Sequence, residues 1–198
     1  MWTARAWRTV PAVQTRSPST DGESVTHSAV EMLVNSADQA GVPLSELCAG
    51  LPFDAHLLRH RMANLGWEHF VEVLERLEAR AGAERILALC ATMPELSPTG
   101  RRLFRRFVST RLLMRFVCSV VGPSMYPMYQ SDWDETEQPD GSVVGHLRIR
   151  LRPGFRGCRL IFRIHAAANA AVPCFVGHPP LAVRAKTDER GGDYWYTL

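Results

Sequence analysis

The stretch SPTGRRLFRRFVSTRLLMRFVCSVVG, residues 97–122, begins as a two-faced helix and then becomes apolar almost all round. At roughly 100° per residue, the arginines between 101 and 106 share one side of its first half, and Leu103, Phe104 and Phe107 share the other. Beyond residue 109, only Arg111 and Arg115 interrupt an otherwise apolar surface. Such a helix favours burial, so we predict a central helix that lies within a domain or at a two-fold interface.

The chain has 198 residues, of which 46% are hydrophobic, so it is large enough to bury a substantial core. We predict three segments: a flexible lead over 1–24, a helical subdomain over 25–95 and an α/β sensing subdomain over 96–198. The lead is rich in Ser, Thr and Pro and has no apolar core of the kind that a secretory signal needs.

Charge and cysteine content exclude several classes of protein. A net charge of +3 creates no field that demands nucleic acid, and the arginines of 101–106 have no aromatic stacking partners on their own side. The closest candidate for a membrane span, 112–121, is about half as long as a bilayer requires and is interrupted by Arg115, so we expect no membrane insertion. The five cysteines never occur in C-x-x-C spacing, which indicates a reducing cytoplasm without a disulfide framework or a zinc site.

The first half of the sequence has the periodicity of helices. One helix is expected from Thr26 or Ser28 to Gly41, with Ser28 and Glu31 at capping-box spacing. Short helices are expected over 44–49 and 54–60, and further ones over 67–82 and 83–92. The helix over 67–82 is the clearest of these, because its apolar residues recur at i, i+3, i+4, i+7 and i+10.

After a predicted break at Gly122 and Pro123, the texture changes to strands. A turn over 138–141 leads into an alternating strand over 143–151, which predicts a hairpin. A helix with an Ala-rich centre is expected over 158–172, and a second hairpin is expected over 182–198, with its turn at Gly191 and Gly192. Together these elements predict an α+β fold, in which amino-terminal helices pack with a small antiparallel sheet and the long central helix.

No catalytic or metal-binding constellation is visible. His56 and His60 share a helical face but lack a third ligand, so we interpret them as solvated or capping residues. His165 lies in an apolar helix and could ligate haem iron, although a core histidine is the simpler interpretation. Cys174 is most simply a small hydrophobe, and the alternating carboxylates at 132, 134, 135 and 137 are interpreted as solvated charge on an edge strand.

Two long stretches resemble known bacterial sensing domains. Residues 156–198 read RGCRLIFRIHAAANAAVPCFVGHPPLAVRAKTDERGGDYWYTL, and they are similar to the end of haem-nitric-oxide-binding and vinyl-reductase-type domains and of sensor histidine kinase input regions. Residues 29–82 read AVEMLVNSADQAGVPLSELCAGLPFDAHLLRHRMANLGWEHFVEVLERLEARAG and look like the ligand-sensing region of AraC-type regulators. The resemblance implies an amino-terminal, cytoplasmic input domain of a bacterial signalling protein, such as a two-component system, that acts on a downstream domain or protein.

The departures from the family pattern bear on the cofactor. Haem-binding members carry a Tyr-x-Ser-x-Arg motif, and the nearest string here, Val108 to Arg111, does not reproduce it. We therefore expect no haem and no other cofactor.

The resemblance implies a small apolar ligand between the central helix and the sheet, and signalling through the rearrangement of a homodimer. The expected ligand-binding residues are Phe116, Trp133, Phe162, His165 and Phe175. Two alternatives remain open at this point. One is a ligand-free interaction or dimerisation module, and the other is a cofactor-free enzyme that uses His165 or Cys174.

Overall fold

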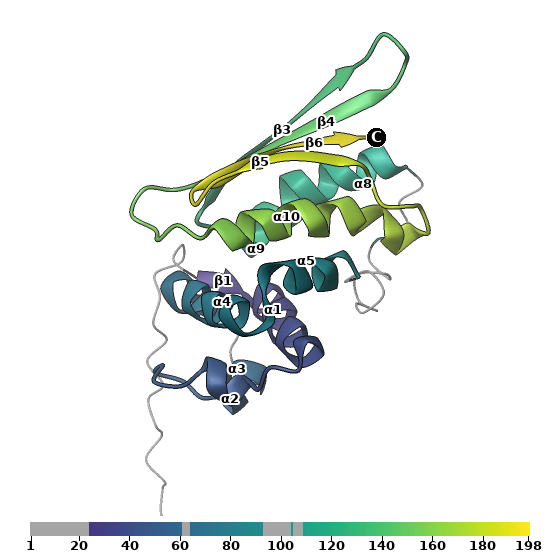
Figure 1. Ribbon diagram of the computed structural model, residues 1–198. Helices are drawn as coiled ribbons and strands as arrows, with labels where there is room; N and C mark the ends of the chain where they lie inside the picture. Colours follow the sequence, from purple (N-terminus) through teal and green to yellow (C-terminus); the bar gives the residue numbers. More distant parts are fainter. Residues whose placement is uncertain (1–23, 61–63, 93–103, 105–108) are drawn as a thin grey trace, which may run out of the picture.

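The computed structural model describes residues 24–60, 64–92, 104 and 109–198 (Figure 1). The described chain forms three layers: a four-stranded sheet, a middle layer of helices, and a helical part built from the first half of the sequence. This is the α+β architecture that the sequence predicts. The lead up to residue 23 and the arginine-rich face of 101–106 lie outside the described residues, apart from Phe104.

The helical part contains α1 (His27–Ala40), α2 (Leu44–Leu47), α3 (Ala55–His60), α4 (Trp67–Ala81) and α5 (Ala83–Ala91). These bounds confirm the predicted helices to within a few residues, and the five apolar positions that define α4 in the sequence are all buried. The predicted capping box is wrong, because α1 begins at His27 and its N-cap, Thr26, makes no side-chain capping bond. An antiparallel pair of short strands, β1 (Ser24–Thr26) and β2 (Asn64–Gly66), was not predicted.

The main sheet is antiparallel throughout and has the order β3-β4-β6-β5. Its strands are β3 (Tyr129–Glu137), β4 (Val143–Leu151), β5 (Val183–Thr187) and β6 (Gly191–Thr197). Helix α10 (Arg159–Ala171) lies along one face of this sheet, and α5 packs against the opposite side of α10 (Figure 1). Because side chains alternate along a strand, Leu147, Tyr194 and Tyr196 are buried beneath the sheet while their neighbours face outward.

The central helix runs without a break through α8 (Thr110–Phe116), the π-helix η1 (Val117–Val121) and α9 (Gly122–Met125). The predicted break at Gly122 and Pro123 is therefore wrong. Proline removes one backbone donor and crowds the carbonyl four residues earlier, and the wider π turn, in which the Gly122 N–H bonds to the Val117 carbonyl, accommodates it.

Among the residues that the structure describes, one side of the central helix is enclosed and the other is half exposed. Leu113 and Met114 are completely buried, whereas Leu112 and Val120 are each 52% exposed. The predicted burial is confirmed for the inner side, and burial of the outer side at a two-fold interface stays a prediction. No helix in the described ranges has the length and apolar character needed to cross a bilayer.

The second hairpin turns earlier than predicted, over Asp188, Glu189 and Arg190, and Gly191 and Gly192 are the first residues of β6. These two glycines do not form the turn. Their missing side chains leave room for neighbouring residues to pack closely. A Cβ atom on Gly192 would collide with the ring and hydroxyl of Tyr194, whose Oη donates a hydrogen bond of 2.8 Å to the Phe162 carbonyl.

Replacing Gly192 with alanine is expected to lower the free energy of unfolding by about 2 kcal/mol, because Tyr194 must leave a close-packed position and its buried hydrogen bond. Urea unfolding of Gly192→Ala measures this. Gly66→Ala is the control, since its added carbon meets the nearest side chain, His69, at an ordinary 3.7 Å. Equal stability of the two variants would contradict the packing role of Gly192.

Candidate functional site

Four aromatic rings meet where the central helix, the sheet and α10 converge, and we call them the aromatic cluster: Tyr126, Tyr129, Phe162 and His165. Tyr126 follows α9 and Tyr129 begins β3, and their rings stack with centroids 5.0 Å apart. The His165 ring stands edge-on to both tyrosines, at 5.1 and 5.4 Å. Phe162, which lies 5.5 Å from Tyr129, is fully buried one turn before His165 on α10.

The aromatic cluster also contacts the helical part. Tyr126 makes an edge contact with Phe70 at 6.2 Å, and Tyr129 makes one with Trp67 at 5.8 Å. Trp67 is fixed in turn by a 2.8 Å hydrogen bond from its Nε1 to the Arg156 carbonyl, just before α10. A substitution within the aromatic cluster therefore alters contacts in all three layers of the fold.

Two polar atoms of the aromatic cluster have no hydrogen-bond partner among the described residues: the Tyr129 hydroxyl and Nε2 of His165. Both residues are buried, with 6% and 9% of their surface exposed. Burial lowers the pKa of His165 to about 4 and raises the pKa of Tyr129 well above its usual value, so both side chains are uncharged at neutral pH. Buried polar atoms in native proteins nearly always have a partner, either protein or ordered water, so this pair distinguishes the aromatic cluster from most of the core.

Both residues line a small cavity between the central helix and the sheet, which we call the π-helix cavity. Its volume is about 30 Å³. Its lining consists of Val117, Cys118, Gly122, Pro123, Tyr129, Ser131, Leu147, Ile149, His165 and Asn169. Most of this wall is apolar, and four residues supply polar groups: Tyr129, Ser131, His165 and Asn169.

A second cavity, of about 20 Å³, lies on the other side of the aromatic cluster. Tyr126 contributes to its wall together with residues of α1, α4, α5 and α10, among them Ser36 and Cys90. Burial raises the pKa of the Cys90 thiol to about 11, while its contact with Ser36 works in the opposite direction. Cys90 is therefore a protonated core residue at neutral pH.

A buried carboxylate ties the central helix to the edge of the sheet. The Glu135 side chain is only 7% exposed and accepts hydrogen bonds from Arg111 at 2.5 Å, Arg115 at 3.0 Å and Trp133 Nε1 at 2.9 Å. Burial alone would raise the pKa of Glu135, but these bonds and the charge of Arg115 lower it to about 2. The interpretation of this carboxylate as solvated charge is wrong, since β3 turns Glu135 towards α8.

Replacing Glu135 with glutamine should reduce the free energy of unfolding by about 2 kcal/mol at neutral pH, because the charged hydrogen bonds to Arg111 and Arg115 are lost. The difference should shrink as the pH falls from 4.5 to 2, where Glu135 of the native chain takes up a proton. Urea titrations across this range test both statements. Glu137→Gln is the control, because that side chain is 77% exposed. If Glu137→Gln lowered the free energy of unfolding as much as Glu135→Gln, the role of Glu135 as the buried partner of the two arginines would be contradicted.

The structure brings together two of the five residues expected to bind ligand, Phe162 and His165. Phe116 ends α8 and is partly buried against the core. Trp133 stacks on Tyr196, with ring centroids 6.2 Å apart. Phe175 lies in the 3-10 helix η2 (Val172–Val176), and its ring meets that of Phe104 edge-on at 5.2 Å. Tyr126 and Tyr129 were not among the expected site residues, because they follow the predicted break at Gly122 and Pro123 and belong to no pattern that the sequence makes visible.

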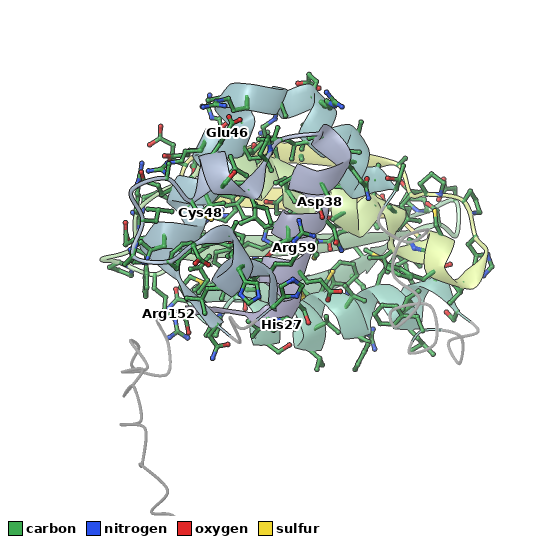
Figure 2. All side chains as sticks on the ribbon, turned by 90° about the horizontal axis from the view of Figure 1, so that it is seen from below. His27, Asp38, Glu46, Cys48, Arg59 and Arg152 are labelled. Carbon is green, nitrogen blue, oxygen red and sulfur yellow. The ribbon has the colours of Figure 1, made fainter. Side chains whose placement is uncertain are left out.

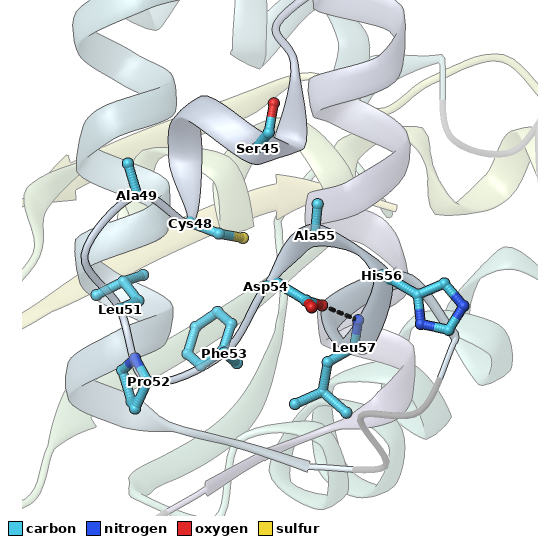
Figure 3. A pocket seen from close by; sticks show the side chains of 10 residues that line it. All are labelled: Ser45, Cys48, Ala49, Leu51, Pro52, Phe53, Asp54, Ala55, His56 and Leu57. Carbon is cyan, nitrogen blue, oxygen red and sulfur yellow. Dashed lines mark hydrogen bonds between the residues drawn. The ribbon is translucent and has the colours of Figure 1, made fainter.

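A larger depression lies elsewhere, between α2 and α3, and measures about 810 Å³ (Figure 3). It is open to solvent, and Asp54 at its rim is already engaged, since it accepts a 2.7 Å bond from the Leu57 N–H and caps α3. His56 and His60 contact each other at 5.1 Å, but the described residues contain no group of three side chains suited to a metal ion. An ion pair of 2.6 Å from Arg59 to Asp38 anchors α3 to α1 (Figure 2).

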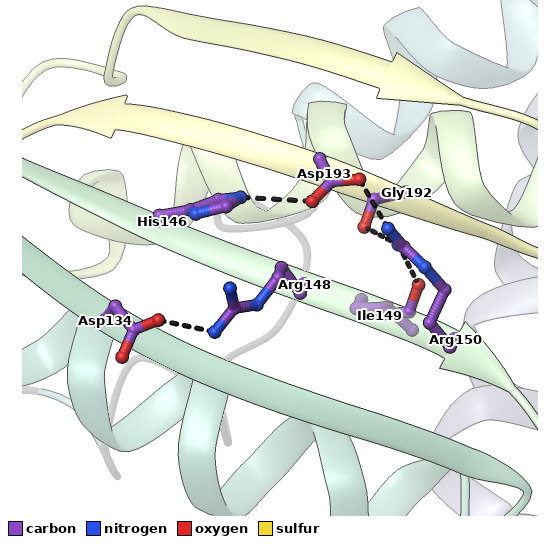
Figure 4. A network of polar contacts seen from close by, with 7 residues as sticks. All are labelled: Asp134, His146, Arg148, Ile149, Arg150, Gly192 and Asp193. Carbon is purple, nitrogen blue, oxygen red and sulfur yellow. Dashed lines mark hydrogen bonds and ion pairs between the residues drawn. The ribbon is translucent and has the colours of Figure 1, made fainter.

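The outer face of the sheet carries charged pairs (Figure 4). Arg148 contacts Asp134 at 2.6 Å, and Asp193 accepts one hydrogen bond from Arg150 at 2.6 Å and contacts His146 at 3.1 Å. The His146 ring also stacks on Trp195, with centroids 4.7 Å apart. The exposed pair of Arg148 and Asp134 contributes little to stability, whereas His146 and Asp193 are half-buried.

Comparison with known proteins identifies a fold. No protein-family model matches the chain, and no curated protein matches it. Among solved structures, the chain is similar to a mutant H-NOX protein from K. algicida in the Fe(II) unliganded state, with a TM-score of 0.58 and 6% identity over 86% of this chain and 95% of that one. It is also similar to an H-NOX protein from S. oneidensis in the Fe(II)NO ligation state, with a TM-score of 0.50 and 11% identity over 85% of this chain and 98% of that one. At these identities the likeness shows a shared α+β fold.

Proposed function

We propose that this chain is a non-catalytic bacterial sensory domain that binds a small molecule between the central helix and the sheet and reports its presence through the pairing of two protomers. One observation supports the proposal: the buried Tyr129 hydroxyl and His165 Nε2 have no partner within the described part of the chain, and their side chains line one cavity at the junction of the layers. The similarity to H-NOX proteins, one of which was solved in an Fe(II)NO state, supports it.

Haem does not fit the described interior. His165 could offer a nitrogen, but its ring is enclosed by Tyr126, Tyr129 and Phe162. The cavities on the two sides of the aromatic cluster measure about 20 and 30 Å³, whereas pockets for larger ligands have about 300 Å³ or more. The aromatic side chains thus occupy the room that a macrocycle would need, and the proposed ligand is a much smaller molecule.

The central helix is suited to pass a signal outward. Its inner side supplies Val117 and Cys118 to the π-helix cavity, while Leu112 and Val120 on its outer side are half exposed. A guest that moves the π turn would move this outer side as well. Exposed apolar side chains on a buried helix favour a protein partner, for which we propose a second copy of the chain, with a downstream signalling domain or protein as the recipient.

Leu112 and Val120 also favour a second candidate function, a dimerisation module without a ligand. In a dimerisation module, unlike in the sensory domain, no molecule bound in the π-helix cavity would affect the pairing of protomers. The enzyme alternative gains no such support: burial is the single cause that shifts the pKa of His165, and no charged partner in the described chain acts on it. Cys174, the other residue that the enzyme alternative would use, lies in η2 and lines neither cavity beside the aromatic cluster.

The test is native mass spectrometry of the full chain, which reports oligomeric state and retained molecules together. We expect a dimer, and we expect Leu112→Glu to weaken its dissociation constant by about tenfold or more, because a charge would be buried in the interface. Val183→Glu, at an apolar position on β5 that is 36% exposed, should leave the dimer intact. A chain that stays monomeric at every concentration would refute the signalling part of the proposal.

A further inference from the structure

We infer that the π-helix cavity is a binding site for an uncharged, hydrogen-bonding molecule of roughly one to three non-hydrogen atoms. This inference rests on the proposed function, because it names the class of ligand that the sensor would bind. It departs from the apolar ligand that the sequence resemblance implies.

The size of the guest follows from the volume of about 30 Å³. One water molecule needs a cavity of at least about 10 to 15 Å³, so water fits and a molecule slightly larger than water also fits. An aromatic or lipid-like ligand would require Tyr129, Phe162 and His165 to leave their mutual ring contacts. Those contacts join buried side chains, and breaking them would cost more than a small apolar ligand returns.

We expect an uncharged guest because of the residues that line the π-helix cavity. None of the ten residues that form the wall is Asp, Glu, Lys or Arg, and its one histidine is neutral because burial disfavours its charged form. An ion that entered would lose its hydration without gaining a counter-charge. The site therefore discriminates against anions such as azide and against ammonium ions.

The need for hydrogen bonding follows from the two unpartnered atoms. The Tyr129 hydroxyl can donate one hydrogen bond, and the neutral imidazole of His165 offers a donor on one nitrogen and an acceptor on the other. A guest that accepts from Tyr129 and bonds Nε2 of His165 satisfies both atoms at once. Ser131 and Asn169, on β3 and α10, bring further polar groups to the same wall.

The π-helix makes the wall adaptable. Val117 and Cys118 line the cavity within η1, where the Gly122 N–H reaches back five residues to the Val117 carbonyl. Single π turns inside α-helices occur often at functional sites. Occupancy of the cavity can thus be converted into a shift of the outer side, where Val120 lies.

The test uses full-length protein labelled with ¹⁵N in histidine, methanol as the uncharged probe and sodium azide as the charged one. We expect methanol to shift the ring nitrogens of His165 saturably, with a midpoint in the range of about 1 to 100 mM that suits so small a ligand. Azide at the same concentrations should leave these signals in place. Tyr129→Phe should weaken methanol binding by about fivefold or more, whereas Tyr126→Phe, in the neighbouring ring, should not change it.

Equal binding of azide and methanol, or a methanol response that is linear and the same in Tyr129→Phe, would overturn the inference. The comparison of methanol with azide on the native chain suffices even where a variant fails to fold. Toluene that binds while methanol does not would overturn this ligand class and leave the sensory proposal standing. Saturable methanol binding in a chain that never dimerises would support the site and overturn the signalling proposal.

Discussion

Acidification from pH 7 to 4 is expected to remove about 3 kcal/mol of stability through His165 alone. Burial lowers the pKa of this residue to about 4 in the folded chain, from an ordinary value of 6.5. Below pH 6.5 the unfolded chain therefore binds a proton that the folded chain does not. Stability that is fully present above pH 6.5 is lost as the pH falls towards 4.

Urea unfolding at pH 7, 6, 5 and 4 measures this loss. His165→Leu removes the titrating group, so its stability should be nearly flat between pH 6.5 and 4.5, and replacement of the exposed His60 with glutamine should leave the native slope unchanged. The contribution of Glu135 lies at lower pH, between 4.5 and 2, which separates the two effects. A native profile as flat as that of His165→Leu would show that the imidazole is not held neutral in the interior.

Replacing Phe162 with alanine should have the largest effect on stability, about 4 kcal/mol. The Phe162 side chain is completely buried, and it contacts Tyr129 and His165 within the aromatic cluster. Because the cluster joins the sheet to the helical part, the loss should appear in one cooperative transition of the whole chain and not in a single subdomain.

Phe175→Ala is the matched control, since Phe175 is partly exposed and its described ring contact is Phe104 alone. We expect it to cost less than half as much as Phe162→Ala in calorimetry or urea unfolding. Two separate transitions in Phe162→Ala, or equal costs for the two variants, would contradict the central position of the aromatic cluster.

Much of the fold could be predicted because local patterns and tertiary packing agree. The apolar spacing of α4 and the alternation of β4 survive in the structure, since each places one side in the core. The errors arise where packing overrides local propensity. Pro123 continues a helix because a π turn makes room for it, and Gly192 is a strand residue because Tyr194 needs its empty space.

The site was predicted only in part for the same reason. Phe162 and His165 were recognised because they lie on an apolar face of a clear helix, but nothing local shows that Tyr126 and Tyr129 stack against them. Glu135 was read as solvated because its partners, Arg111 and Arg115, are about twenty or more residues away in the chain. Pairings across such distances are set by the register of β3 beside α8, which short-range patterns do not encode.

The central claim is that a small uncharged guest beside Tyr129 and His165 alters the pairing of two protomers. Sedimentation velocity, with and without methanol at saturating concentration, tests it most directly. The native chain should change its dimer dissociation constant by about fivefold or more, and Tyr129→Phe should not respond. A dissociation constant that is the same with and without methanol, in a chain whose His165 signals show the cavity filled, would contradict the account.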